Sequence, residues 1–387
     1  MPAKPWILTD TVNEIYQETF DETAQMVNPH TKKMFPVRIA KRKLHGGQSE
    51  GIDEILLDNG VLSLSVLPTR GMGIHRGICG DVELKWNSPV FGPIHPSFVP
   101  VTDDGGLGWL EGFDEWLVRC GLESNGSPEW DKTGKLLYPL HGRIANTPAR
   151  YVSLSMEEQT GKITLTGKVA EAKLFFKRLE LTSELVMFAG SSEFTIRDTI
   201  TNLSAQPGEF QLLYHINTGQ PFATPGTRVV VPYNRMAPRS PASVENLADW
   251  NKLGPETPGS EEVVFFFEPA YGKNGQCKTM LINPKGNRAL TLAFGKEFPY
   301  FSLWKSRLAD ADGYVCGLEP SINFPNNKSF EKQQGRVGKL NPGESRTFEL
   351  CFGILHDSEN VEKAEQEIRN ISAHGKTEPK PVKEWTP

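Results

Sequence analysis

Alternating hydrophobic and polar positions dominate the middle of the chain and predict β-strands. Four strand-like segments follow one another with short polar turns, at residues 151–156, 163–169, 174–188 and 194–200. Similar segments occur at residues 263–267, 278–283, 289–294, 301–304 and 346–355, and an Asp-Asn-Gly turn predicts a hairpin within residues 55–67. Strands joined by short turns pair antiparallel, whereas parallel pairing needs long crossovers. The pattern therefore predicts an all-β, mainly antiparallel fold.

Two segments instead follow the helical period, and we expect them to form peripheral helices at both ends of the fold. In residues 10–26 the apolar positions recur near the helical spacing, after Asp10 or Thr11 as a cap. The charged segment 358–371 predicts the second helix. Residues 376–387 then read as a frayed tail, as chain ends often are.

The chain shows no convincing linker and no repeat of fixed period, so we predict one main domain. Residues 1–30 are expected to be an N-terminal extension with the first helix. Residues 31–372 are expected to form a single β-sandwich domain, and residues 373–387 a C-terminal tail. A length of 387 residues is compatible with one large β domain.

Composition and charge exclude several classes of protein. The net charge is −5 and the one short basic cluster is Lys41-Arg42-Lys43, which argues against a nucleic-acid partner. No apolar run is long enough for a membrane helix, and no apolar signal segment indicates export. The five cysteines are widely spaced without a C-x-x-C pair, which predicts neither a disulfide framework nor a thiolate zinc site. We therefore expect a cytoplasmic protein that does not bind membranes. Glycine-rich phosphate-binding loops are missing, so nucleotide binding is not expected either.

One predicted strand, residues 210–217, has two chemically different faces. Alternation puts Phe210, Leu212, Tyr214 and Ile216 on one side, and Gln211, Leu213, His215 and Asn217 on the other. The first face is typical of a core. The second places His215 beside Asn217, which is typical either of a ligand site or of a polar corner that bonds backbone groups.

Other candidate residues lie where strands end or regular alternation fades. Arg70 follows a strand, and His141 precedes Arg143 by two residues. Between residues 86 and 130 the chain is rich in Gly, Pro and Trp, and so long an irregular stretch is usually functional. Its tryptophans are core plugs or stacking surfaces for sugar C–H groups; they are Trp86, Trp109, Trp116 and Trp130.

Glu319 is the candidate base, because it ends a strand just before Pro320 and shares a strand face with Gly317, which leaves space beside it. A glutamate in a walled cleft can have its pKa tuned for proton transfer. The alternative is an ordinary surface salt bridge.

The order of several motifs resembles the galactose mutarotase (aldose 1-epimerase) superfamily over roughly residues 45–356. These motifs are Leu140-His141-Gly142, Thr201-Asn202-Leu203, Leu213-Tyr214-His215-Ile216-Asn217, Leu318-Glu319-Pro320 and Leu340-Asn341-Pro342-Gly343-Glu344-Ser345. Two further stretches are similar to an uncharacterised aldose 1-epimerase-like branch, which also has Glu319-Pro320 followed by Gln334-Gly335-Arg336. They are Pro68-Thr69-Arg70-Gly71-Met72 and Arg119-Cys120-Gly121-Leu122-Glu123.

The resemblance implies a large β-sandwich, a supersandwich, that binds a sugar on a concave face. It implies that His215 is the general acid, that Glu319 is the general base, and that neither a metal nor an organic cofactor is needed. It also implies that His141 contacts the sugar, but no residue clearly matches the arginine and the aspartate that position hydroxyl groups in typical mutarotases. Arg70 and Arg143 are candidates for the arginine and Asp114 for the aspartate, and the other expected sugar-binding residues are Asn217, Trp109 and Arg119. We expect Arg70, His141, His215 and Glu319 to converge on one cleft.

The implied activity is the interconversion of the anomers of a monosaccharide or a derivative, in a monomer or homodimer whose partner is the small sugar. Two alternatives stay open, because one fold supports many reactions. The protein could bind or sense a sugar without catalysis, or could be a lyase or hydrolase on a modified glycoside.

Overall fold

The computed structural model describes residues 5–371 and 375–387, and in them two large β-sheets form the fold. The first sheet has ten strands, in the spatial order β17 (Arg228–Val230), β20 (Gln276–Ile282), β21 (Ala289–Gly295), β25 (Ser345–Leu355), β15 (Glu193–Asn202), β14 (Arg178–Phe188), β13 (Lys162–Ala172), β12 (Tyr151–Glu157), β1 (Trp6–Asp10) and β2 (Ile15–Tyr16).

The second sheet has fourteen strands and carries the candidate site. Twelve of them follow the order β26 (Lys376–Thr377), β18 (Tyr233–Pro238), β19 (Val263–Pro269), β22 (Tyr300–Ser306), β23 (Val315–Ser321), β16 (Gly208–Gly219), β9 (Leu117–Leu122), β7 (Gly73–Cys79), β6 (Leu62–Leu67), β5 (Asp53–Asp58), β4 (Met34–Lys43) and β3 (Phe20–Val27). Strand β24 (Gly338–Leu340) pairs with β16, and β8 (Val82–Leu84) pairs with β7.

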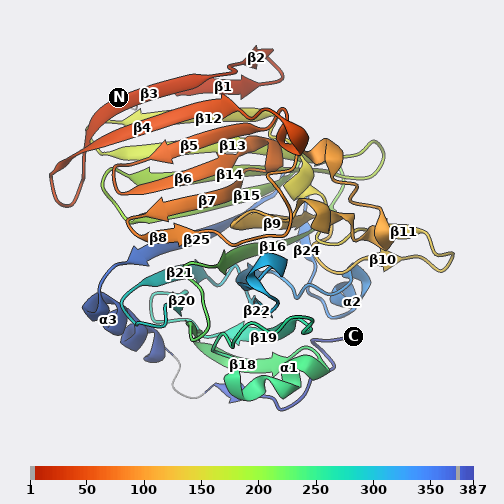
Figure 1. The fold of residues 1–387 in the computed structure, drawn as a ribbon. Helices are drawn as coiled ribbons and strands as arrows, with labels where there is room; N and C mark the ends of the chain where they lie inside the picture. Colours follow the sequence, from red (N-terminus) through yellow and green to blue (C-terminus); the bar gives the residue numbers. More distant parts are fainter. Residues whose placement is uncertain (1–4, 372–374) are drawn as a thin grey trace.

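Short helices and a small hairpin lie outside the sheets. The helices are α1 (Pro241–Glu245), α2 (Lys328–Gln333) and α3 (Ser358–Arg369), and the hairpin joins β10 (Glu129–Trp130) to β11 (Leu136–Tyr138). Figure 1 shows α3, α1 and α2 at the periphery and the strands of the two sheets as layers, one behind the other.

The two sheets pack face to face because their strands alternate. In β13 every second residue is buried, and Ile163 and Leu165 join Leu57 and Leu64 of the other sheet in one apolar cluster. That cluster contains residues from both sheets. The antiparallel pairing holds for every sheet pair except β18 with β26, which is parallel. The predicted all-β sandwich is therefore confirmed.

The predicted hairpin at residues 55–67 is also confirmed, as β5 and β6. Its turn is closed by Asn59, whose Oδ1 accepts hydrogen bonds from the backbone amides of Val61 and Leu62 at 3.0 and 2.8 Å. A short amide side chain that bonds its own backbone in this way is the reason Asn-Gly sequences favour turns.

The predicted N-terminal helix at residues 10–26 is wrong, because this segment forms β1, β2 and β3. Asp10 Oδ1 accepts from the backbone amides of Val12 at 3.0 Å and Asn13 at 3.3 Å, which builds a turn rather than a helix cap. Strand β3 then pairs with β4 at the edge of its sheet. Residues 5–30 therefore belong to both sheets, and residues 1–4 of the expected extension lie outside the described residues.

The C-terminal helix is confirmed as α3, but the expectation of a frayed tail is wrong for residues 376–387. Trp385 is only 3% exposed and packs against Phe324, with ring centroids 5.2 Å apart. Its carbonyl oxygen accepts from Asn326 Nδ2 at 2.9 Å, and Arg235 lies over its ring. Burial of this indole anchors the segment. Residues 373 and 374 of the expected tail lie outside the described residues.

Candidate active site

Strand register brings His215 and Glu319 together, although 104 positions separate them in the chain. Strands β16 and β23 pair Leu213 with Ser321 and Ile216 with Leu318, so His215 is directly opposite Glu319. Directly opposite residues on one sheet face have touching side chains. His215 Nε2 lies 3.1 Å from Glu319 Oε1, and the two side chains are 6% and 4% exposed.

The alternation of β16 separates this pair from the core. Phe210, Leu212, Tyr214 and Ile216 point into the main apolar cluster between the sheets. On the other face, Leu213 joins a smaller aromatic cluster that surrounds the pair. Strand β16 therefore supports the sandwich with one face and the candidate site with the other.

Aromatic rings wall the site around His215. The centroids of Phe113 and Trp304 each lie 5.0 Å from that of His215, in edge-to-face contacts. His141 lies 5.7 Å from His215 and packs against Trp109 at 4.7 Å. The structure thus brings His141, His215, Glu319 and Trp109 into one neighbourhood. Apolar walls with a few polar groups are typical of small-ligand sites.

Two polar groups in this wall are available to a ligand. His141 Nδ1 donates to the backbone oxygen of Asn125 at 2.9 Å, which leaves its Nε2 as an acceptor. Trp109 Nε1 is buried and has no hydrogen-bond partner in the described part of the chain. A buried indole N–H usually has a partner, so this donor fits a ligand oxygen.

Gly317 leaves space beside the side chains of His215 and Glu319. A Cβ built at this position would lie 3.0 Å from a ring carbon of Trp304, 3.1 Å from Glu319 Oε1 and 3.2 Å from His215 Cε1. Such contacts are tighter than ordinary van der Waals distances. The space beside Glu319 therefore depends on the missing side chain of Gly317.

Burial shifts the pKa values of Glu319 and His215 in opposite directions. It raises the pKa of Glu319 well above its usual value, an effect that nearby Glu262 strengthens and Arg239 opposes. Burial and the neighbouring His141 lower the pKa of His215 to about 3, and burial lowers the pKa of His141 to about 4. The raised pKa of Glu319 and the lowered pKa of His215 both favour a protonated carboxyl group opposite a neutral imidazole.

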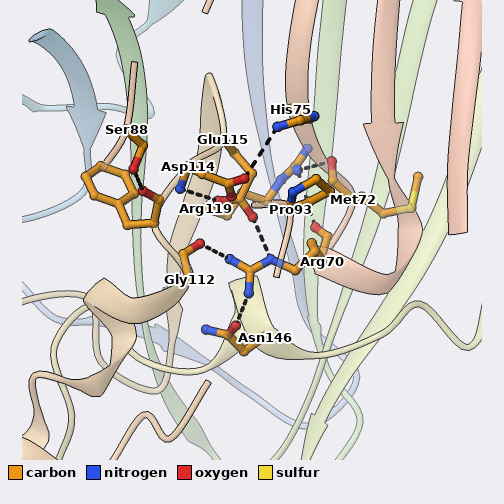
Figure 2. Close-up of polar contacts among 12 residues, drawn as sticks. Arg70, Met72, His75, Ser88, Pro93, Gly112, Asp114, Glu115, Arg119 and Asn146 are labelled. Atoms are coloured by element: carbon orange, nitrogen blue, oxygen red, sulfur yellow. Dashed lines mark hydrogen bonds and ion pairs between the residues drawn. The ribbon is translucent and has the colours of Figure 1, made fainter. Parts of the chain in front are cut away.

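Arg70 is not brought to this pair. Its Nε donates to Glu115 Oε1 at 2.8 Å, and its two terminal nitrogens donate to Asn146 Oδ1 and to the backbone oxygen of Gly112. Figure 2 shows the guanidinium group facing these three residues. These polar contacts are all with protein groups and none is with His215, so of the four residues expected to converge the structure brings together His141, His215 and Glu319 but not Arg70.

Arg119 lies on the opposite face of the sheet from His215, because β9 pairs it with Tyr214. It is 2% exposed and forms an ion pair with Asp198, which is fully buried. Tyr214 also donates to Asp198, and Arg119 donates to the backbone oxygen of Met72 at 2.7 Å. The expectation that Arg119 contacts the sugar is therefore wrong, because its guanidinium group is paired with Asp198 between the two sheets.

Of three other predicted residues, Asp114 and Arg143 are placed away from the reacting groups, whereas Asn217 contacts the ring of His215. Asp114 is buried and faces His75, with Oδ2 3.4 Å from Nε2 (Figure 2). Arg143 is exposed, and its guanidinium makes no polar contact within the described residues. Asn217 is fully buried beneath His215, where it bonds protein groups on both sides.

Sequence reasoning missed three residues at the rim. Arg239 Nη1 lies 3.0 Å from Glu262 Oε1, and Trp304 Nε1 donates to Glu262 Oε2 at 2.9 Å. Trp304 ends a predicted strand, but its nearness to Glu319 depends on the register of β22 with β23, which the sequence does not show. Arg239 carried no signal, since it follows the end of β18 in a stretch that reads as a loop.

Neither a metal site nor a membrane span is found in residues 5–371 and 375–387. No group of three or more His, Cys, Asp and Glu side chains there is arranged to hold a metal ion. The five cysteines are free. No described helix is long and apolar enough to cross a bilayer.

The two sheets form a galactose mutarotase-like fold, and comparisons with solved structures agree. A candidate aldose 1-epimerase from Klebsiella pneumoniae subsp. pneumoniae matches with a TM-score of 0.91 at 31% identity, over 97% of each chain. A galactose mutarotase-like protein from Clostridium acetobutylicum matches with a TM-score of 0.56 at 14% identity, over 81% of this chain and 97% of that one. A candidate aldose 1-epimerase from Escherichia coli K12 matches with a TM-score of 0.51 at 16% identity, over 79% and 100%.

The chain also matches a model of a protein family. The model of a domain of unknown function, DUF4432, matches residues 49–354, and this chain belongs to that family. No curated protein matches the chain.

Proposed function

We propose that this protein is an aldose 1-epimerase-like enzyme that interconverts the anomers of a monosaccharide or a close derivative. The observation that carries the proposal is the buried His215–Glu319 pair, whose Nε2 and Oε1 atoms lie 3.1 Å apart and whose pKa values are shifted toward a protonated carboxyl group and a neutral imidazole. Mutarotation needs one group that gives a proton and one that takes a proton, and a pair with one proton can do both.

The proposed reaction uses the pair as a unit. Transfer of the resting proton from Glu319 to His215 Nε2 gives the carboxylate base and the imidazolium acid that the family resemblance implies. Glu319 then takes the proton of the anomeric hydroxyl while His215 gives its proton to the ring oxygen. The C1–O5 bond breaks, a C1=O1 carbonyl forms, and rotation about C1–C2 lets the ring close on the other face. The number of protons on the pair is restored at the end.

The surrounding residues supply the sugar contacts in this proposal. His141 Nε2 accepts from a sugar hydroxyl, and Trp109 Nε1 donates to a sugar oxygen, because both atoms are free for a ligand. Phe113 and Trp304 give apolar surfaces for the C–H faces of the ring. Arg239 and Glu262 lie at the rim, where a hydroxyl or a charged substituent of the sugar would reach them.

The direct test measures anomer exchange by NMR magnetisation transfer with a panel of aldoses, sugar phosphates and sugar acids. On a sugar that the wild type interconverts, Glu319→Gln is expected to lower the exchange rate by about 10²- to 10⁴-fold, the usual contribution of general acid–base catalysis. His215→Ala should lower it comparably, and Arg197→Met, at an exposed position on β15 of the other sheet, serves as the control. Binding of a panel sugar without exchange would instead support a sugar-binding protein, and release of a cleaved product would support a lyase or hydrolase.

A further inference from the structure

We propose that Asn217 is a positioning residue that fixes which ring nitrogen of His215 carries a proton, and therefore which nitrogen reacts. The proposal rests on the proposed function of the His215–Glu319 pair. It replaces the sugar contact that the sequence predicts for Asn217.

The orientation of the Asn217 amide follows from its contact with the backbone oxygen of Glu115. Asn217 Nδ2 lies 3.0 Å from the backbone oxygen of Glu115, which can only accept. The reverse orientation would set two oxygens against each other at this distance. The NH₂ group therefore faces Glu115, and Oδ1 faces His215 Nδ1, with which it is in hydrogen-bond contact.

This orientation determines the tautomer of His215. Because Asn217 Oδ1 is an acceptor, Nδ1 of His215 must carry the hydrogen and donate it. In a neutral imidazole the other nitrogen then has the lone pair. Nε2 therefore presents that lone pair to Glu319 Oε1, and the carboxyl proton lies between the two residues. The opposite tautomer would set an N–H against a protonated acid.

A buried ion pair holds the anchoring carbonyl in place. The Glu115 side chain is fixed by Arg70, and the Glu115 backbone oxygen also accepts from Trp86 Nε1 at 3.2 Å. Two donors on one carbonyl, together with the Arg70 ion pair, restrict its movement. The Arg70–Glu115 pair, which Figure 2 shows, thus supports the active pair through the backbone oxygen of Glu115 and the amide of Asn217.

The titratable groups around His215 leave this arrangement intact near neutral pH. Glu319 faces the ring from β23, and His141 faces it from the segment after β11. Cys120 on neighbouring β9 is a neutral thiol, since burial raises its pKa well above the usual value. Arg239 and Glu262 act on Glu319 and His141 from the rim as a mutually paired cation and anion. None of these groups provides another acceptor for Nδ1.

The first test needs no variant and no substrate. Nitrogen-15 NMR of the histidine side chains in the intact protein distinguishes a protonated from an unprotonated ring nitrogen. For His215 at pH 7 we expect Nδ1 to be protonated and Nε2 to have the shift of a lone-pair nitrogen that accepts a hydrogen bond. A spectrum with the proton on Nε2 and a bare Nδ1 overturns the proposal.

Variants of Asn217 give the functional test. Asn217→Leu removes the acceptor at similar size and should mix the two tautomers, lowering kcat by about 10- to 100-fold with KM within about twofold, as for other supporting residues. Asn217→Asp retains an acceptor opposite Nδ1, so it should keep the Nδ1–H tautomer and exceed the Leu variant in kcat. The control is Asn234→Leu on β18, which removes an exposed amide that donates to the backbone oxygen of Pro269 on β19.

The outcomes separate this inference from the proposed function. If Asn217→Leu raised KM alone, Asn217 would be a sugar contact and the inference would fail. If it left both the tautomer and kcat unchanged, the inference would fail as well. If no panel sugar showed exchange in the wild type, the proposed function would fail, while the nitrogen-15 spectrum would still decide the tautomer.

Discussion

Replacement of Arg119 by Met tests whether this arginine belongs to the sandwich interior or to the sugar site. The Arg119 side chain is 2% exposed and its partner Asp198 is not exposed at all. Methionine fills a similar volume without charge, so Asp198 would keep the Tyr214 hydroxyl but lose its cation. Removing one partner of a buried ion pair typically costs about 3–5 kcal/mol.

An independent route gives a similar magnitude. A stranded aspartate can escape its charge by taking up a proton, which costs about 4 kcal/mol at pH 7 and about 1.5 kcal/mol at pH 5 for an aspartic acid of ordinary acidity. We therefore expect Arg119→Met to lower the free energy of unfolding by about 4 kcal/mol at pH 7. The penalty should shrink by more than half at pH 5, because protonation becomes easier as the pH falls.

Urea unfolding of the variant and the wild type at both pH values measures this penalty. Using the difference at each pH removes the pH dependence that the two proteins share. Arg143→Met is the matched control, since this exposed arginine should change stability by less than about 0.5 kcal/mol. Wild-type stability of Arg119→Met together with weakened sugar binding would refute the reasoning and restore Arg119 to the sugar site.

Three further predictions follow from the packing and the pKa shifts. Trp385→Ala should cost about 3–5 kcal/mol in urea unfolding, since it empties a buried indole site, whereas an unchanged midpoint would mean that residues 376–387 are not docked. Neutral His141 contributes stability that is fully present above pH 6.5 and is lost as the pH falls through its folded pKa of about 4. His141→Asn should therefore reduce the loss of stability between pH 7 and 4.5 by about 2–3 kcal/mol, and an unaltered pH slope would contradict this. Gly317→Ala should lower anomer exchange about tenfold or more by displacing Glu319 or His215, while wild-type exchange would show that the space is not needed.

The local pattern of the chain was enough to predict most strands and the two faces of β16. Alternation depends on neighbouring residues only, so His215 and Asn217 could be assigned to one face before any fold was known. The meeting of His215 with Glu319 depends on the register of two strands about one hundred residues apart. Periodicity carries no information about that register, and the convergence came from the family resemblance.

The errors have different physical origins. Residues 10–26 contain apolar positions that fit a helical and a strand period, and pairing with β4 decided in favour of the strand. The buried arginines were misassigned because a guanidinium that binds a sugar and one that neutralises Asp198 or Glu115 look the same in a sequence. Residues 376–387 read as a tail because Trp385 is separated in sequence from Phe324, against which it packs.

The measurement that tests the central claim most directly is the pH dependence of anomer exchange between pH 5.5 and 10, in the wild type and in Glu319→Gln. The account predicts that the wild-type rate stays level on the acid side, because the folded pKa of His215 is about 3, and falls as the pH rises through the raised pKa of Glu319. Glu319→Gln should be about 10²- to 10⁴-fold slower and lack the alkaline fall. A wild-type rate that rises through pH 6.5, or a Glu319→Gln variant at the wild-type rate, would contradict the claim that this buried pair acts through one shared proton.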